Sequence, residues 1–159
     1  MKFTLVRDLR EDALMRPLLA GLLLFALLFL GADALLKSEQ LGLAPSALAA
    51  TLYGDEENYV DPMPATSLTE QVHASLFFMM FTLLTLGATY VRLAGGRGLR
   101  MLPMHLSMLA GLSDPALLLL AYYGDDAFVL PWLGAFWLWH AGALFMALAS
   151  LARLVRPGR

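Results

Sequence analysis

The sequence contains no cysteine, which excludes disulfide bonds, thiolate metal sites, iron–sulfur clusters and covalently attached c-type haem. It is also poor in charge, since 15% of its 159 residues are charged whereas soluble domains have about 25%. Its net charge of −2 provides no field that attracts nucleic acid, so no nucleic-acid partner is expected. It lacks hydrolase, phosphate-binding and dinucleotide-binding motifs, which argues against an enzyme.

Apolar residues, in contrast, are abundant and occur in long runs. They make up 59% of the chain, and the mean hydropathy is +0.66. Runs of about 20 apolar residues are typical of membrane-spanning helices. The sequence therefore predicts an all-α integral membrane protein, with residues 1–159 forming one domain in the lipid bilayer. The predicted spans are residues 17–36, 72–91, 101–122 and 129–154.

The positions of the cations predict how the spans are oriented. Ten of the eleven Lys and Arg residues lie before the first span, between the second and third spans, or at the end of the fourth span and after it; the exception is Lys37. Because cytoplasmic segments are enriched in Lys and Arg, both termini are expected in the cytoplasm. Residues 37–66 then form a longer extracytoplasmic loop. Short connections favour an up-down-up-down four-helix bundle, and the composition is typical of a bacterial inner-membrane protein.

Two local patterns predict helix boundaries near this loop. Residues 45–53 read as a short interfacial helix, since Pro45 suits a first helical position and Gly54 suits a position just after the helix. The pattern Ser67-Leu68-Thr69-Glu70 is a capping box, which places the start of the second long helix near Leu68.

Two ionisable residues lie deep within the predicted spans. Asp114 is 14 residues from Arg100, and His140 is 13 residues from Arg153. At a rise of 1.5 Å per residue, both are roughly 20 Å from the cytoplasmic boundary. Because the third and fourth spans are antiparallel neighbours, we expect Asp114 and His140 to form an intramembrane hydrogen bond or ion pair.

Three functional interpretations remain open. The first is an accessory or assembly subunit of a larger membrane complex, with a protein partner or a second copy of the chain. Small residues at four-residue spacing allow close helix approach: Ser107 and Gly111 on the third span, Ala143 and Ala147 on the fourth.

The second interpretation is an electron-transfer bundle that binds a b-type haem. Membrane and soluble bundles hold haem through histidines on facing helices. His73 and His140 both lie in the outer half of their spans and are the candidate ligands, whereas His105 lies near the cytoplasmic side.

The third interpretation is a proton-coupled carrier or a metal site. Chains of intramembrane Asp, Glu and His residues are typical of proton relays, and Asp114 with His140 would be the central pair. Glu70 and His73 form a Glu-x-x-His pair, a spacing that carboxylate-rich metal sites use. Asp33 is the third candidate metal ligand.

Overall fold

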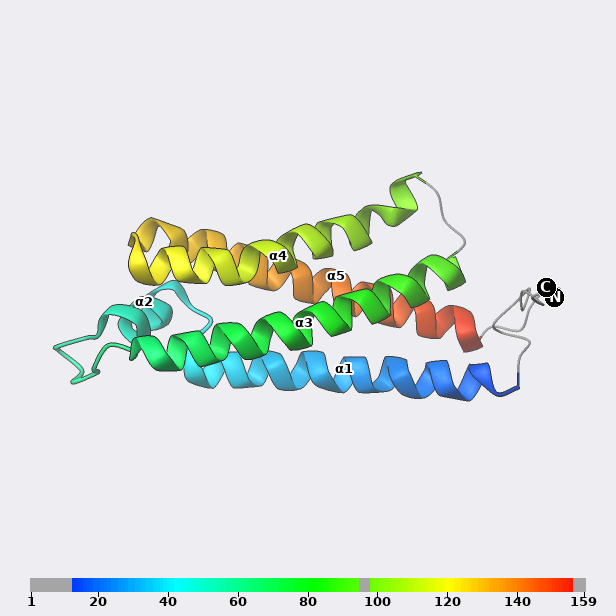
Figure 1. The fold of residues 1–159 in the computed structure, drawn as a ribbon, viewed down its shortest axis with the longest axis horizontal. Coiled ribbons are helices and arrows are strands. Elements are labelled where there is room, and N and C mark those ends of the chain that lie inside the picture. Colours follow the sequence, from blue (N-terminus) through cyan, green and yellow to red (C-terminus); the bar gives the residue numbers. More distant parts are fainter. Residues whose placement is uncertain (1–12, 95–97, 156–159) are drawn as a thin grey trace.

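The computed structural model describes residues 13–94 and 98–155, which form an elongated bundle of helices (Figure 1). Four long helices run along the bundle, and a short helix lies at one end, which we call the α2 end. The elements in chain order are α1 Met15–Gln40, α2 Pro45–Tyr53, α3 Ala65–Ala94, η1 Gly98–Met101, α4 Leu102–Tyr123, η2 Asp126–Phe128 and α5 Val129–Val155.

The long helices confirm the predicted four-span fold. Each of α1, α3, α4 and α5 is long and apolar enough to cross a membrane. Successive long helices run in opposite directions along the bundle (Figure 1). Helix α5 packs against α1, α3 and α4, most extensively against α4, and so forms the centre of the bundle.

The apolar core has two parts that meet near the middle of α5. The part at the α2 end is built around Trp132 and Phe136 and is covered by Leu48 and Leu52 of α2. The other part occupies the rest of the bundle and includes Trp139. The boundary between the two parts therefore falls between Phe136 and Trp139.

The predicted short helix over residues 45–53 is confirmed. Helix α2 begins with Pro45, and Gly54 follows its last residue with a φ of 86°. This left-handed conformation favours glycine. A Cβ at Gly54 would also lie 3.0 Å from the Val60 carbonyl oxygen, so the tight return of the chain requires a residue without a side chain at this position.

The predicted start of the second long helix is wrong by three residues. Helix α3 begins at Ala65, and the Leu68 amide donates to the Pro64 carbonyl at 3.2 Å. The Thr69 hydroxyl donates to the Ala65 carbonyl at 2.8 Å, so the predicted capping box, residues 67–70, already lies inside the helix. Its side chains are therefore not needed as caps.

Helix α1 is longer than predicted and packs through a narrow seam. It ends at Gln40 rather than Leu36, so Lys37 belongs to the helix and not to the loop. Within the described chain, α1 buries only Leu23, Leu30 and Lys37, which are spaced seven residues apart. A seam this narrow gives α1 little apolar contact with the bundle at the α2 end.

Two tyrosines fasten the loop around α2 to the end of α4. The Tyr53 hydroxyl donates to the Ala121 carbonyl at 2.6 Å, and the Tyr122 hydroxyl donates to the Met63 carbonyl at 2.8 Å. Burial, followed by the charges of Asp126 and Asp125, raises the pKa of Tyr53 above its usual value. The phenol therefore remains a hydrogen-bond donor at neutral pH.

Removing either tyrosine hydroxyl is expected to weaken the α2 end modestly. Tyr53→Phe and Tyr122→Phe should each lower the free energy of unfolding by about 1 kcal/mol, the net value of a typical hydrogen bond. Reversible unfolding in mixed micelles measures this effect. Tyr123→Phe is the control, because Tyr123 is largely exposed and packs its ring on Tyr122. Equal stability of all three variants would contradict the fastening role.

Candidate functional site

Four ionisable side chains from three helices meet where the two parts of the core join. On α1, the Lys37 Nζ lies 3.6 Å from the Asp33 Oδ2, and it also lies 3.9 Å from the Asp114 Oδ2 on α4. The same Asp33 oxygen lies 3.2 Å from the His140 Nε2 on α5. We call Asp33, Lys37, Asp114 and His140 the charge cluster.

The charge cluster is buried. The side chains of Lys37 and Asp114 are 4% and 2% exposed, and those of His140 and Asp33 are 8% and 12% exposed. An isolated charge at the centre of a membrane helix costs about 2.5–3.5 kcal/mol on insertion scales, so such groups need partners. The Lys37 ammonium is a partner for both carboxylates, and its contact with Asp114 joins α1 to α4.

Local helix geometry sets the positions of the four groups. Asp33 and Lys37 lie one turn apart on α1, where side chains four residues apart are neighbours. Asp114 lies inside α4 and is followed by Pro115, which has no amide hydrogen. The carbonyl of Gly111, four residues before Pro115, therefore lacks its usual helical donor, which makes this part of α4 more polar.

The His140 imidazole is held in one orientation. Its Nδ1 lies 2.9 Å from the Phe136 carbonyl oxygen, which can only accept a hydrogen bond. The hydrogen of a neutral ring is therefore on Nδ1, and the lone pair of Nε2 faces the Asp33 carboxylate. One further proton, on Nε2 or on Asp33, would turn this repulsion into attraction. The geometry thus creates a place for a proton between His140 and Asp33.

Two aromatic rings pack against the His140 imidazole. The ring centroids of Phe136 and Trp139 lie 4.1 Å and 3.8 Å from that of His140. The Lys37 ammonium lies 5.3 Å from the centroid of the Phe136 ring, within the range of a cation–π interaction. The same ring therefore contacts both the cation and the imidazole.

The charge cluster is short of one positive charge while the imidazole is neutral. It then contains two carboxylates, Asp33 and Asp114, against the single ammonium of Lys37. Among the described residues, the buried atoms Asp33 Oδ2, Asp114 Oδ1 and His140 Nε2 have no hydrogen-bond partner. One bound proton or one small cation would balance the charges and would give these atoms an interaction partner.

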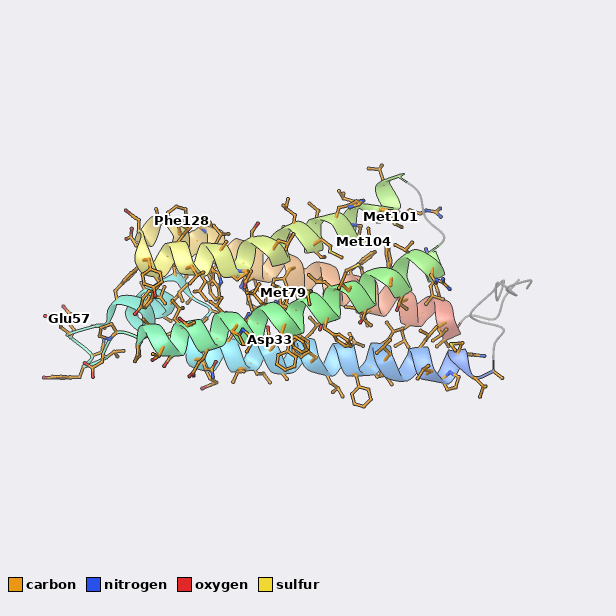
Figure 2. All side chains as sticks on the ribbon, in the orientation of Figure 1. Asp33, Glu57, Met79, Met101, Met104 and Phe128 are labelled. Atoms are coloured by element: carbon orange, nitrogen blue, oxygen red, sulfur yellow. The ribbon has the colours of Figure 1, made fainter. Side chains whose placement is uncertain are left out.

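A groove between α1 and α3 leads to the charge cluster. It has a volume of about 600 Å³, and its walls include Asp33, Lys37, Glu70, Gln71, Phe29 and Phe78. Figure 2 shows Asp33 on α1 at the side that faces α3. We call this cavity the α1–α3 groove. Asp33 and Lys37 line the groove and also belong to the charge cluster, so the cluster lies at the wall of the groove.

Asp114 and His140 lie in the same cluster, but not as the direct pair that the sequence suggested. In the described chain Asp114 pairs with Lys37, and His140 pairs with Asp33. The difference arises because α1 extends beyond Leu36 and brings Lys37 to Asp114, while Asp33 on the same helix lies next to His140. The cluster thus has two members more than the predicted pair.

The other candidate residues lie apart from this cluster. His73, Glu70 and His105 are exposed on the surface of the bundle, and His73 does not line the α1–α3 groove. His140 is buried, so the structure does not bring together the two predicted haem ligands. No three His, Asp or Glu side chains within residues 13–94 and 98–155 group as metal ligands, and Asp33, Glu70 and His73 are not assembled.

A family comparison matches most of the chain. The model of the Aq_1264_TM family, a transmembrane helical domain, matches residues 42–159. The chain belongs to this family. Neither the curated proteins nor the solved structures gave a match.

The match to the transmembrane helical domain divides the charge cluster. It covers α2 to α5, including Asp114 and His140, whereas Asp33 and Lys37 on α1 precede it. In this chain, α1 therefore completes a polar site whose other half lies inside the family domain.

Proposed function

We propose that this membrane protein is a proton-coupled carrier whose charge cluster exchanges protons with the side of the membrane that the α2 end faces. The observation that supports this function is the contact between His140 and Asp33, in which a carboxylate faces an imidazole nitrogen that lacks a hydrogen-bond partner. A proton is the simplest species that this arrangement holds, and protonation changes how strongly α1 is attached.

The α1–α3 groove supports access from one side. It lies near the α2 end, whereas the buried core in the other part of the bundle is filled by apolar side chains around Leu23, Leu86 and Met146. The predicted orientation places the α2 end outside the cytoplasm, so protons would enter from there. The narrow seam of α1 suits a helix that shifts when the charge of the cluster changes.

Tryptophan fluorescence provides a direct test of proton exchange. The Trp139 and His140 rings are in contact, and a protonated imidazole quenches an adjacent excited indole. In a Trp132→Phe, Trp137→Phe background, the emission of Trp139 should fall as the pH is lowered, because a proton added to the imidazole gives the ring a positive charge. The groups facing the imidazole are Asp33 and Lys37 on α1 and Asp114 on α4.

Matched histidine variants identify the source of the signal. His140→Gln in the same background should abolish the pH response, whereas His73→Gln and His105→Gln should keep it, because both residues are exposed. A flat emission profile in the parent, or a profile that survives His140→Gln, would show that the charge cluster does not exchange protons and would overturn the proposed function.

A further inference from the structure

The α1–α3 groove is one half of a larger amphipathic crevice. A second cavity of about 430 Å³ lies between the same two helices, and its walls include Phe25, Phe77 and Phe81. Phe29 and Phe78 line both cavities, so the two are neighbours. The crevice thus combines a polar compartment beside the charge cluster with an aromatic compartment that extends along the bundle.

The polar compartment carries an excess of negative charge. Asp33 and Glu70 contribute carboxylates to its walls, whereas Lys37 contributes the single ammonium among the described lining residues. That ammonium is shared, because the Lys37 Nζ also lies 3.9 Å from Asp114. A positively charged ligand would therefore be attracted into the compartment, and an anion would be repelled.

The aromatic walls favour an organic cation over a hydrated metal ion. The Phe29 and Phe78 rings lie 5.9 Å apart at an interplanar angle of 36°, directly between the two compartments. Aromatic faces attract ammonium groups that have lost part of their water shell. A ligand with an apolar body could place its charge at the carboxylates and its body against these rings.

An unused hydrogen-bond donor lies in the same wall. The Gln71 Nε2 is buried and has no hydrogen-bond partner among the described residues. A buried donor without a partner is costly, and an acceptor on the ligand would satisfy it. The crevice therefore presents three complementary features: carboxylates, aromatic rings and one amide donor.

We propose that the crevice binds an organic ammonium ion with an apolar or aromatic body and a hydrogen-bond acceptor, and that this cation displaces the proton of the charge cluster. The proposal rests on the proposed carrier function and identifies its substrate class. The cation brings one positive charge to the carboxylates, and the displaced proton leaves through the groove to water. Charge is conserved, because one cation replaces one proton.

Binding can be measured with a matched pair of ligands. The probe is benzoylcholine, which combines a phenyl ring, an ester acceptor and a quaternary ammonium; the control ligand is 3,3-dimethylbutyl benzoate, in which carbon replaces nitrogen. Calorimetry on the full chain in phosphatidylglycerol nanodiscs should show binding of benzoylcholine but not of the neutral ester. In a weak buffer, a pH dye should report release of about one proton per bound cation.

Variants locate the site within the crevice. Asp33→Asn and Glu70→Gln should each weaken benzoylcholine binding about tenfold or more, because each removes a carboxylate from the wall. Phe78→Ala should weaken it about fivefold through the lost ring contact. Glu39→Gln is the control; Glu39 is exposed on α1, does not line the groove, and its change should leave binding unaltered.

The outcomes separate this proposal from the carrier function. Equal binding of the neutral ester, or full binding by Asp33→Asn and Glu70→Gln, would overturn the cation site even when the emission of Trp139 still responds to pH. Loss of benzoylcholine binding in nanodiscs that contain phosphatidylethanolamine would show that the ammonium group of a lipid occupies the site. This result would overturn the proposal that the ligand is a soluble cation.

Proteoliposomes add the test of transport itself. With a pH dye inside, external benzoylcholine should make the lumen more alkaline as cation enters and proton leaves, and Asp114→Asn should abolish this change. Binding without a change in luminal pH would contradict the carrier function while leaving the binding site established.

Discussion

Replacement of Lys37 with methionine is expected to destabilise the folded bundle by about 3–5 kcal/mol, the usual cost of removing one partner from a buried ion pair. Methionine keeps most of the apolar stem of lysine but removes the ammonium. Asp33 and Asp114 would then lie at the core boundary with no cation between them. The loss is measured as the change in the free energy of unfolding in mixed micelles.

A rescue experiment distinguishes this electrostatic cause from a packing defect. Adding Asp114→Asn to Lys37→Met removes one of the orphaned carboxylates, so it should restore a substantial part of the lost stability. A packing defect would leave the double variant as unstable as the single one, or less stable. Glu39→Gln, an exposed change two residues from Lys37 on α1, should have almost no effect.

The same substitution connects stability to function. Helix α1 buries only Leu23 and Leu30 besides Lys37 within the described chain, so the charge cluster is its main attachment near the α2 end. A protein that moves α1 when a proton binds must hold this helix through groups that titrate. An all-apolar seam would bind the helix more simply but could not respond to protons.

Long apolar runs predicted the membrane-spanning helices well, because such spans are defined by length and composition. The four spans and the short helix over residues 45–53 depend on apolar runs and on Pro and Gly positions, which are local properties. The sequence also indicated that Asp114 and His140 lie at similar depth, since depth follows from a count of residues at constant rise.

The partners of Asp114 and His140 could not be predicted in the same way. Depth says nothing about the rotation of α1, and Lys37 was assigned to the loop because charges usually mark the end of a span. One signal was present: Asp33 and Lys37 are separated by four residues, so a continued helix pairs them across one turn. The rotation that turns this pair inward is set by tertiary packing.

Helix rotation, which depth does not predict, also explains why His73 and Glu70 are exposed. Both are at a depth compatible with a ligand site, but α3 turns them away from His140.

The interpretation as an accessory subunit with a protein partner stays a prediction. Purification of the full chain in mild detergent, followed by identification of stoichiometric partners, would test it.

Close contact between α4 and α5 depends on the absence of a side chain at Gly142. A Cβ built at this position would overlap the Ser107 hydroxyl and would lie 3.3 Å from the Pro103 carbonyl oxygen. That hydroxyl cannot move away freely, because it donates to the same carbonyl at 2.7 Å. Gly142 is therefore one of the small residues that allow close helix approach. The four-residue spacing of Ala143 and Ala147 did not indicate it.

Gly142→Ala is therefore expected to destabilise the bundle by about 1–3 kcal/mol, as overpacking of a tight contact does. Gly134→Ala on the same helix is the matched control: a Cβ there meets no atom within 4 Å, so the better helix propensity of alanine should stabilise it by up to about 1 kcal/mol. The two alanine variants should thus change the free energy of unfolding in opposite directions.

Adding Ser107→Gly to Gly142→Ala clears the overlap and should recover stability. If Gly142→Ala were as stable as Gly134→Ala, the helices could not approach each other as closely as this contact requires, and the position of Asp114 relative to His140 would have to differ as well.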